Sequence, residues 1–426
     1  MVAKLIIILC VFKCYFCDFG KEVSYNISLV LRWETLDFEW PDKDRKLESV
    51  TNRTFVPKNN FIRGFRLWQD FALITIPRWK SGVPVTLAKL TTATNSSDGR
   101  MGSPVLQPYP SWAMQNIDDC YALQSAHSIE IDSDEKLWVL DNGMIEELEH
   151  NRTVCPAKLM IIDLKSNFII RTLIIPSEMT RPGSTFTSMA IDKYKQIAYI
   201  PDSIYDQSGF IVYDFNIDSF KRFDCEHLNV DDETFNFNNI PENLWSQFVS
   251  VSLNTDRNKL YFSIFDSDDL FFVRVSVFDE NITDISTRVE NLGKYGRSVQ
   301  LTADPKGYMY FDVLNRKAVA QWRENSWVFQ YTPHIVVQSK LLCHWISSLD
   351  IDSNGYLWIA STRFYDYVSN KVNDHKDNFR IFKVFVPRME NPKKPKTGFN
   401  AEYVVLVLFI IIIGLIIVEI LMFNSD

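Results

Sequence analysis

Glycine and proline are scarce in this chain of 426 residues, which has 14 and 17 of them. Their scarcity excludes collagen-like and low-complexity architectures. Basic residues are also in deficit, since 45 Lys and Arg stand against 53 Asp and Glu and give a net charge of −8. A nucleic-acid partner is therefore not expected. Hydrophobic residues make up 46% and aromatic residues 14%, enough for a sizeable core, which excludes wholesale disorder.

Catalytic and metal-binding motifs are also missing. The sequence has no GxSxG elbow, HExxH helix, Walker loop or GxGxxG turn. Residues 350–355 imitate the start of an EF-hand loop, but the twelfth position is Ser361, so a β-turn is the better interpretation. His127 could line a central channel or be an ordinary histidine of the core. We predict no catalytic residue, no metal site and no cofactor.

The N-terminus has the pattern of a secretory signal. Lys4 precedes an apolar run over residues 5–12, which is too short to span a membrane. Lys13 follows, and there is no small-x-small cleavage site. We predict a signal peptide over residues 1–17, with its end undefined.

The C-terminus predicts a membrane anchor. Residues 403–423 are apolar apart from Gly414 and Glu419. As a helix these 21 residues would extend about 30 Å, enough to cross a bilayer. A stalk rich in Pro and Lys precedes them over residues 389–402. The alternative is a GPI signal, in which this segment would be replaced.

Two signals disagree about the orientation of the anchor. The stalk lysines Lys393, Lys394 and Lys396 would favour a cytosolic placement. The signal peptide and the cysteines favour the outside, and we predict a type I protein that faces the extracellular space. Four cysteines remain beyond the signal: Cys120, Cys155, Cys225 and Cys343. They suit two disulfides in an oxidising compartment, with three possible pairings. Five sequons are candidate glycosylation sites: Asn26, Asn52, Asn95, Asn151 and Asn281.

The body of the chain repeats one motif, in which an alternating apolar strand and a polar turn precede a strand with an aromatic residue. A degenerate first copy covers residues 61–75. The aromatic residues of the other copies, spaced 61, 62, 49 and 48 apart, are Trp138, Tyr199, Tyr261, Tyr310 and Trp358. Six copies with room for four strands each predict an all-β, six-bladed β-propeller over residues 21–388. A pair of β-sandwiches is the competing interpretation.

A propeller must close its ring. Residues 32–40 and 379–386 both alternate as strands do, and they flank the repeats. We expect them to pair in one blade, because that pairing removes exposed sheet edges.

Several strings carry a resemblance to a known family. The most specific are residues 33–38, 76–87, 106–112, 137–143 and 155–159. In these strings, and from Trp33 to Val386 as a whole, the sequence resembles the yellow/major royal jelly proteins. The resemblance implies a secreted six-bladed propeller, and it favours the disulfides Cys120–Cys155 and Cys225–Cys343. A terminal membrane span departs from the family's usual secreted pattern.

The resemblance implies three candidate functions. The first is a surface protein that binds a small aromatic amine or catechol in a pocket on the propeller axis, linked to pigmentation or cuticle. The second is a dopachrome-converting enzyme of melanin formation, and the third is a structural surface protein without a ligand. We place binding first, because no acid–base pair can be named for catalysis.

The same resemblance suggests the residues of the binding site. The segment ending in Thr362 and Phe364 resembles the family segment whose Asn and Phe contact amines. Phe364 matches, whereas Thr362 replaces the Asn and keeps a hydroxyl group without the amide carbonyl. Tyr109 is a second aromatic candidate and Ser347 a polar one.

Overall fold

A computed structural model of the chain describes residues 27–92, 103–203, 208–225, 248–265, 267–324 and 329–386. The predicted signal peptide, stalk and membrane anchor lie outside the described residues, as do Asn26 and Asn95. Within the described ranges, no helix has the length and apolar character needed to span a membrane. The sequon residues Asn52, Asn151 and Asn281 are exposed, as glycosylation would require.

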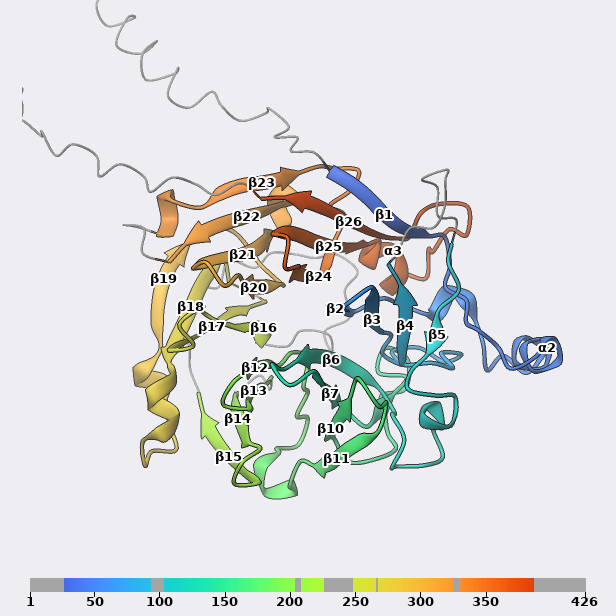
Figure 1. The fold of residues 1–426 in the computed structure, drawn as a ribbon, viewed down its shortest axis with the longest axis horizontal. Helices are drawn as coiled ribbons and strands as arrows, with labels where there is room; N and C mark the ends of the chain where they lie inside the picture. Colours follow the sequence, from blue (N-terminus) through green and yellow to red (C-terminus); the bar gives the residue numbers. More distant parts are fainter. Residues whose placement is uncertain are drawn as a thin grey trace, which may run out of the picture. The chain divides into compact units, whose positions relative to one another are not determined.

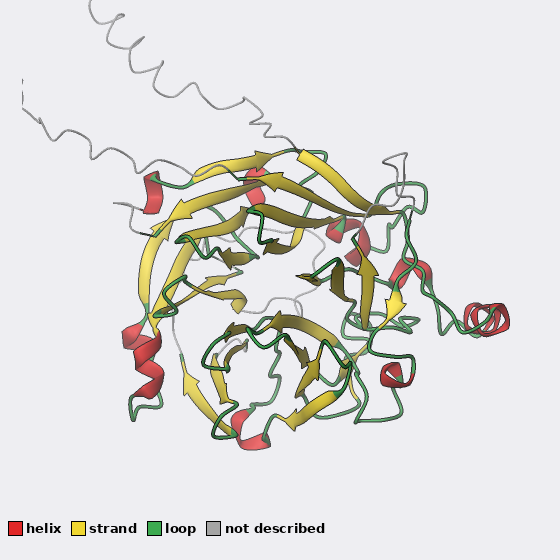
Figure 2. Cartoon of the chain, viewed as in Figure 1, coloured by secondary structure: helices red, strands yellow, loops and turns green. Residues whose placement is uncertain are grey.

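The described residues form six four-stranded antiparallel sheets arranged as the blades of a ring (Figures 1 and 2). Strands are given from the axis outward. Blade 1 contains β2 (Gly64–Trp68), β3 (Phe71–Thr75), β4 (Leu87–Thr91) and β5 (Gln107–Pro108); blade 2 contains β6 (Ala126–Ile131), β7 (Lys136–Asp141), β10 (Lys158–Asp163) and β11 (Ile169–Ile174). Blade 3 contains β12 (Ala190–Asp192), β13 (Ile197–Asp202), β14 (Gly209–Asp214) and β15 (Ser219–Asp224); blade 4 contains β16 (Phe248–Leu253), β17 (Lys259–Ile264), β18 (Asp269–Arg274) and β19 (Glu290–Lys294). Blade 5 contains β20 (Leu301–Ala303), β21 (Tyr308–Val313), β22 (Ala318–Arg323) and β23 (His334–Gln338); blade 6 contains β24 (Ile346–Ile351), β25 (Tyr356–Thr362), β26 (Phe379–Phe385) and β1 (Ile27–Trp33).

Smaller elements decorate the ring. They are the helices α2 (Lys43–Thr51) and α3 (Phe364–Val368) and the hairpin of β8 (Met144–Ile145) with β9 (Arg152–Thr153). The prediction of a six-bladed propeller is confirmed, and the β-sandwich alternative is wrong.

The repeated motif owes its form to an aspartate in the turn between the first two strands of a blade. In blade 6, Asp352 Oδ1 accepts the N–H groups of Asn354 and Tyr356, both at 2.9 Å, and Oδ2 accepts the indole N–H of Trp358 at 2.9 Å. Blades 2 and 5 repeat the arrangement with Asp132 and Asp304. The carboxylate therefore satisfies the turn and the aromatic tip together, which explains why residues 350–355 resemble a calcium loop.

The first and last described strands close blade 6, as expected. β1 pairs with β26 in antiparallel register, with Trp33 opposite Phe379. The prediction that residues 32–40 form this strand is wrong, because β1 ends at Trp33 and the chain then turns away. Phe38 instead forms an isolated bridge with Leu106 in the segment that enters β5. Trp33 is fully buried and donates its indole N–H to the Pro104 carbonyl at 2.7 Å.

Serine hydroxyls join neighbouring blades next to the axis. Each of three serines on a blade's innermost segment accepts a backbone N–H from the innermost strand of the next blade. These bonds run from Val251 to Ser188 (3.3 Å), from Leu301 to Ser250 (3.0 Å) and from Phe65 to Ser348 (3.2 Å). A small polar residue at this position lets the blades approach closely and still satisfies a buried N–H group.

Buried aspartates at the end of the second strand fasten the segment that enters the same blade. Asp141 accepts the N–H groups of Gln124 and Ser125 at 2.6 and 2.9 Å. Asp312 accepts those of Val299 and Gln300 at 2.7 and 2.8 Å. Lys158 lies 3.5 Å from Asp141, but Asp312 has no cationic partner among the described residues. Burial outweighs its hydrogen bonds and raises the pKa of Asp312 to about 7.

Asp312 should therefore make stability fall as the pH rises. Its pKa in the unfolded chain is near 4, so between about pH 4 and pH 7 the folded state keeps a proton that the unfolded state releases. We expect the free energy of unfolding to fall by on the order of 2 kcal/mol more in the wild type than in Asp312→Asn between about pH 5 and pH 7. Urea titrations of both proteins across this range test it, and parallel pH profiles would contradict it.

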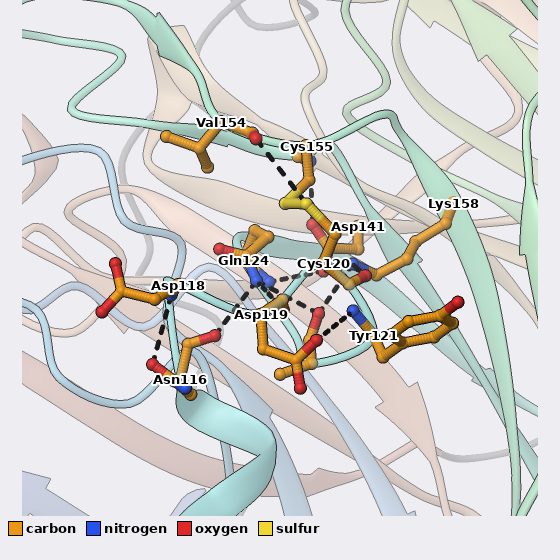
Figure 3. Close-up of a disulfide and its surroundings, with 12 residues drawn as sticks. Asn116, Asp118, Asp119, Cys120, Tyr121, Gln124, Asp141, Val154, Cys155 and Lys158 are labelled. Atoms are coloured by element: carbon orange, nitrogen blue, oxygen red, sulfur yellow. Dashed lines mark hydrogen bonds and ion pairs between the residues drawn. A yellow bond between two sulfur atoms is a disulfide. The ribbon is translucent and has the colours of Figure 1, made fainter.

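The cysteines form one disulfide of the two expected. Cys120 and Cys155 are bonded, with 1.98 Å between the sulfur atoms (Figure 3). The prediction of Cys225–Cys343 is wrong, because both are buried free thiols. Cys225 follows β15 and packs in the apolar cluster between blades 3 and 4, whereas Cys343 lies in the connection from blade 5 to blade 6. Burial raises the pKa of each thiol to about 12, so both stay protonated.

Candidate functional site

A constriction divides the propeller axis. The Arg63 guanidinium donates to the Ser347 carbonyl of blade 6 at 3.2 Å and to the Thr187 carbonyl, just before β12 of blade 3, at 3.3 Å. Around it is a narrow cavity of about 20 Å³, which His127 and Ser188 also line. Burial, and then the neighbouring Arg66, lower the pKa of Arg63 to about 10. The constriction separates two ends of the axis. We call the end at the turns between the first and second strand of each blade the turn end. We call the opposite end, where the longer connections lie, the loop end.

Aromatic side chains from blades 1 and 6 gather at the loop end. Phe364, at the start of α3, has its ring centroid 4.4 Å from that of Trp345 and 6.2 Å from that of Trp79. Phe61 packs against both Phe364 and Tyr367, at 5.5 and 4.8 Å. We call these five residues the aromatic cluster. They come from four connections, two near each end of the propeller's sequence, and the ring closure brings them together.

Buried polar atoms without partners lie in and beside the aromatic cluster. They are Trp79 Nε1, Ser347 Oγ and Thr362 Oγ1, and none has a hydrogen-bond partner within the described structure. Ser347 and Thr362 are 1% and 2% exposed. Because buried polar groups are nearly always paired, a set of unpaired ones marks a place where a ligand can supply the missing partners.

A carboxylate lies close to the aromatic cluster. Glu147 Oε1 is 2.8 Å from Nε2 of His127, whose ring centroid is 6.0 Å from that of Trp79. The backbone N–H of Leu148, next to Glu147, donates to the Trp79 carbonyl at 2.8 Å. Glu147 and His127 are both largely buried, so the pair provides a charged or strongly polar group beside an apolar wall. His127 thus both borders the axial cavity and is held by a partner in the core.

Three of the four predicted ligand-binding residues lie around Trp345. Phe364 contacts its ring, the Thr362 N–H donates to its carbonyl at 2.8 Å, and Ser347 follows it by two residues. The structure does not bring Tyr109 to this place. Tyr109 follows the outermost strand of blade 1 and packs in the apolar cluster between blades 1 and 2, where Lys89 Nζ lies 5.3 Å from its ring centroid. We therefore leave Tyr109 out of the site.

Sequence reasoning missed Phe61, Trp79, Trp345, Tyr367 and Glu147 as members of the site. Trp79 stands within residues 76–87, one of the strings that carry the family resemblance, and that was its only signal. Phe61 begins the degenerate first copy of the repeat, which gave no indication of a site. Trp345, Tyr367 and Glu147 lie in connections outside the repeats.

Comparisons with known proteins agree with this architecture. A family model described as major royal jelly protein matches residues 124–393, more than half of the chain. Major royal jelly protein 7 of Apis mellifera is 26% identical over 395 residues, which cover 85% of either chain. Protein yellow of Drosophila madeirensis is 25% identical over 383 residues, covering 85% of this chain and 66% of that one. A crystal structure of a protein of unknown function from Bacteroides thetaiotaomicron aligns with a TM-score of 0.50 at 9% identity, over 85% of this chain and 76% of that one, which supports the fold alone.

Proposed function

Since this chain belongs to the major royal jelly protein family, we propose that it is an extracellular or cell-surface propeller that binds a small aromatic amine or catechol at the loop end of its axis. The observation that carries the proposal is the group of unpaired buried polar atoms beside the aromatic cluster. We include in the proposal a type I anchor through residues 403–423 and a role linked to pigmentation or cuticle.

The chemistry of the loop end suits such a ligand. Trp79, Trp345 and Phe364 form an aromatic wall, and a cation beside such rings gains about 0.5–2 kcal/mol. The hydroxyls of Thr362 and Ser347 can bond to phenolic oxygens. The Glu147 carboxylate provides a counter-charge for an ammonium group.

Variants of Thr362 test this proposal most directly. Its hydroxyl has no partner among the residues that the structure describes, so Thr362→Val should leave the thermal stability unchanged or slightly raised. We expect the same change to weaken tyramine or dopamine binding by at least about fivefold. Thr362→Asn should strengthen it, because it restores the amide that the family segment has. Isothermal titration calorimetry on the full-length protein measures both.

Phe364→Ala provides the second test, with at least about fivefold weaker amine binding expected. Phe168→Ala is the matched control, since Phe168 is 75% exposed in the turn between β10 and β11. Amine affinity that stays unchanged in both Thr362→Val and Phe364→Ala would overturn the proposal.

A further inference from the structure

The turn end of the axis holds a separate cavity of about 420 Å³. The serines that join neighbouring blades, such as Ser250 and Ser348, mark one position of the innermost strand. Two residues after this position, every innermost strand has a residue that lines the cavity. In order of the blades these are Arg66, Glu130, Ala190, Ser252, Thr302 and Asp350. Blades 6, 1 and 2 thus provide charged side chains, and blades 3, 4 and 5 provide small ones. The small residues leave the volume that a larger side chain would fill.

Most charged groups of the wall already form ion pairs or hydrogen bonds within the protein. Arg66 is ion-paired with Glu130 Oε1 and also donates to Ser348 Oγ at 3.4 Å and the Leu349 carbonyl at 3.3 Å. Asp350 accepts the Leu67 N–H at 2.8 Å. Glu130 Oε2, by contrast, has no hydrogen-bond donor among the described residues. The floor therefore carries two carboxylates and one guanidinium, and Glu130 retains one free acceptor.

The mouth of the cavity carries the opposite charge. Lys193 is exposed in the turn between β12 and β13 and has no ion pair among the described side chains. Arg257 lies 4.3 Å from the ring centroid of Tyr194 and 3.6 Å from Asp192 Oδ1. Asp304 also borders the cavity, but its oxygens accept two turn N–H groups and the Tyr310 hydroxyl. The mouth thus offers cations, while the floor offers a carboxylate oxygen.

Apolar residues also line the cavity, among them Val251, Leu253, Leu301, Ala303 and Pro305. We propose that the turn end binds a zwitterionic amino acid with an apolar side chain. Its ammonium group meets Glu130 Oε2, its carboxylate meets Lys193 and Arg257, and its side chain lies on the apolar lining. Opposite charges on the two sides of one cavity select a ligand that carries both, because a ligand with one charge leaves the other side unpaired.

Three related compounds test the proposal on the full-length protein by isothermal titration calorimetry. L-Phenylalanine carries both charges, phenethylamine lacks the carboxylate and 3-phenylpropionate lacks the ammonium group. We expect saturable binding of L-phenylalanine. In Phe364→Ala, where the loop end is disabled, we expect binding at least about tenfold weaker for either truncated compound. Phenethylamine can also bind at the loop end. Binding there should be lost in Phe364→Ala and kept in Lys193→Met, which distinguishes it from binding at the turn end.

Lys193→Met should weaken L-phenylalanine binding at least about fivefold. Lys195→Met is its matched control, since Lys195 is exposed in the same turn but does not line the cavity. Glu130→Gln should remove the preference for L-phenylalanine over 3-phenylpropionate. If this variant fails to fold because Arg66 loses its partner, Thr302→Leu tests the cavity instead, by filling it from the small-residue side.

The proposal is overturned if L-phenylalanine shows no saturable binding, or if it binds to Phe364→Ala no more tightly than phenethylamine does. It is also overturned if Lys193→Met binds L-phenylalanine as Lys195→Met does. Loss of amine binding in Phe364→Ala with L-phenylalanine binding retained supports two separate sites.

Discussion

Asp141→Asn is expected to lower the free energy of unfolding by about 3–5 kcal/mol, which would be among the largest effects of any single substitution in this protein. Asp141 is fully buried at the end of β7. Its carboxylate accepts the N–H groups of Gln124, Ser125 and Gly143 at 2.6–2.9 Å. The variant places an NH₂ group against one or more of these donors.

The substitution also removes the charge opposite Lys158. Lys158 is 1% exposed and donates to the carbonyls of Cys120 and Ala122 at 2.8 and 2.6 Å. These contacts lie beside the disulfide (Figure 3). Without Asp141, a buried ammonium group keeps dipolar partners but loses its counter-ion, which is the costly way to break a buried ion pair.

Urea unfolding of Asp141→Asn and the wild type measures the loss. The matched control is Asp134→Asn, which breaks a pair of the same kind at the surface, 2.9 Å from Lys136. The Asp134 side chain is 58% exposed, so we expect its loss to have little effect on stability. Equal effects of the two substitutions would show that Asp141 does not fasten blade 2.

Gly143→Ala is expected to destabilise the protein by about 4 kcal/mol or more. Gly143 has a φ of +68°, in the left-handed region that residues with a Cβ rarely adopt. An added Cβ would also lie 2.0 Å from the Cys155 carbonyl oxygen. This atom belongs to the backbone of a disulfide-bonded residue, so it cannot swing aside as the end of a side chain would.

Gly183→Ala separates these two causes. Gly183 has a φ of +88°, but an added Cβ would meet no atom within 4 Å, so its substitution should cost only the backbone strain of about 1–2 kcal/mol. The difference between the two variants in thermal or urea unfolding is the cost of the clash with Cys155. If both variants lose the same stability, the close approach of these two segments does not contribute to the fold.

The sequence by itself determined the number of blades and the ring closure. The number of blades follows from local contacts that recur with the motif, such as the Asp352–Trp358 pair. The ring closure followed from the two alternating segments that flank the repeats, although the paired residues, such as Trp33 and Phe379, are far apart in sequence. The limits of the closing strand were not predictable, because alternation continues beyond Trp33 while the backbone turns away. The Cys120–Cys155 bond was predicted from the family resemblance, and both cysteines belong to segments of blade 2.

The tertiary structure alone decided which side chains meet at the axis. Trp79, Trp345 and Phe364 come from connections up to 285 residues apart, and no local pattern links them. The turn-end cavity exists because three consecutive blades, each about 50–60 residues from the next, carry small residues at one position of the innermost strand. The predictions that placed Tyr109 in the binding site and paired Cys225 with Cys343 were wrong for the same reason. A residue's depth within its blade and the direction of its side chain follow from how six sheets pack around a common axis, and this packing is not encoded in the residue's own neighbours.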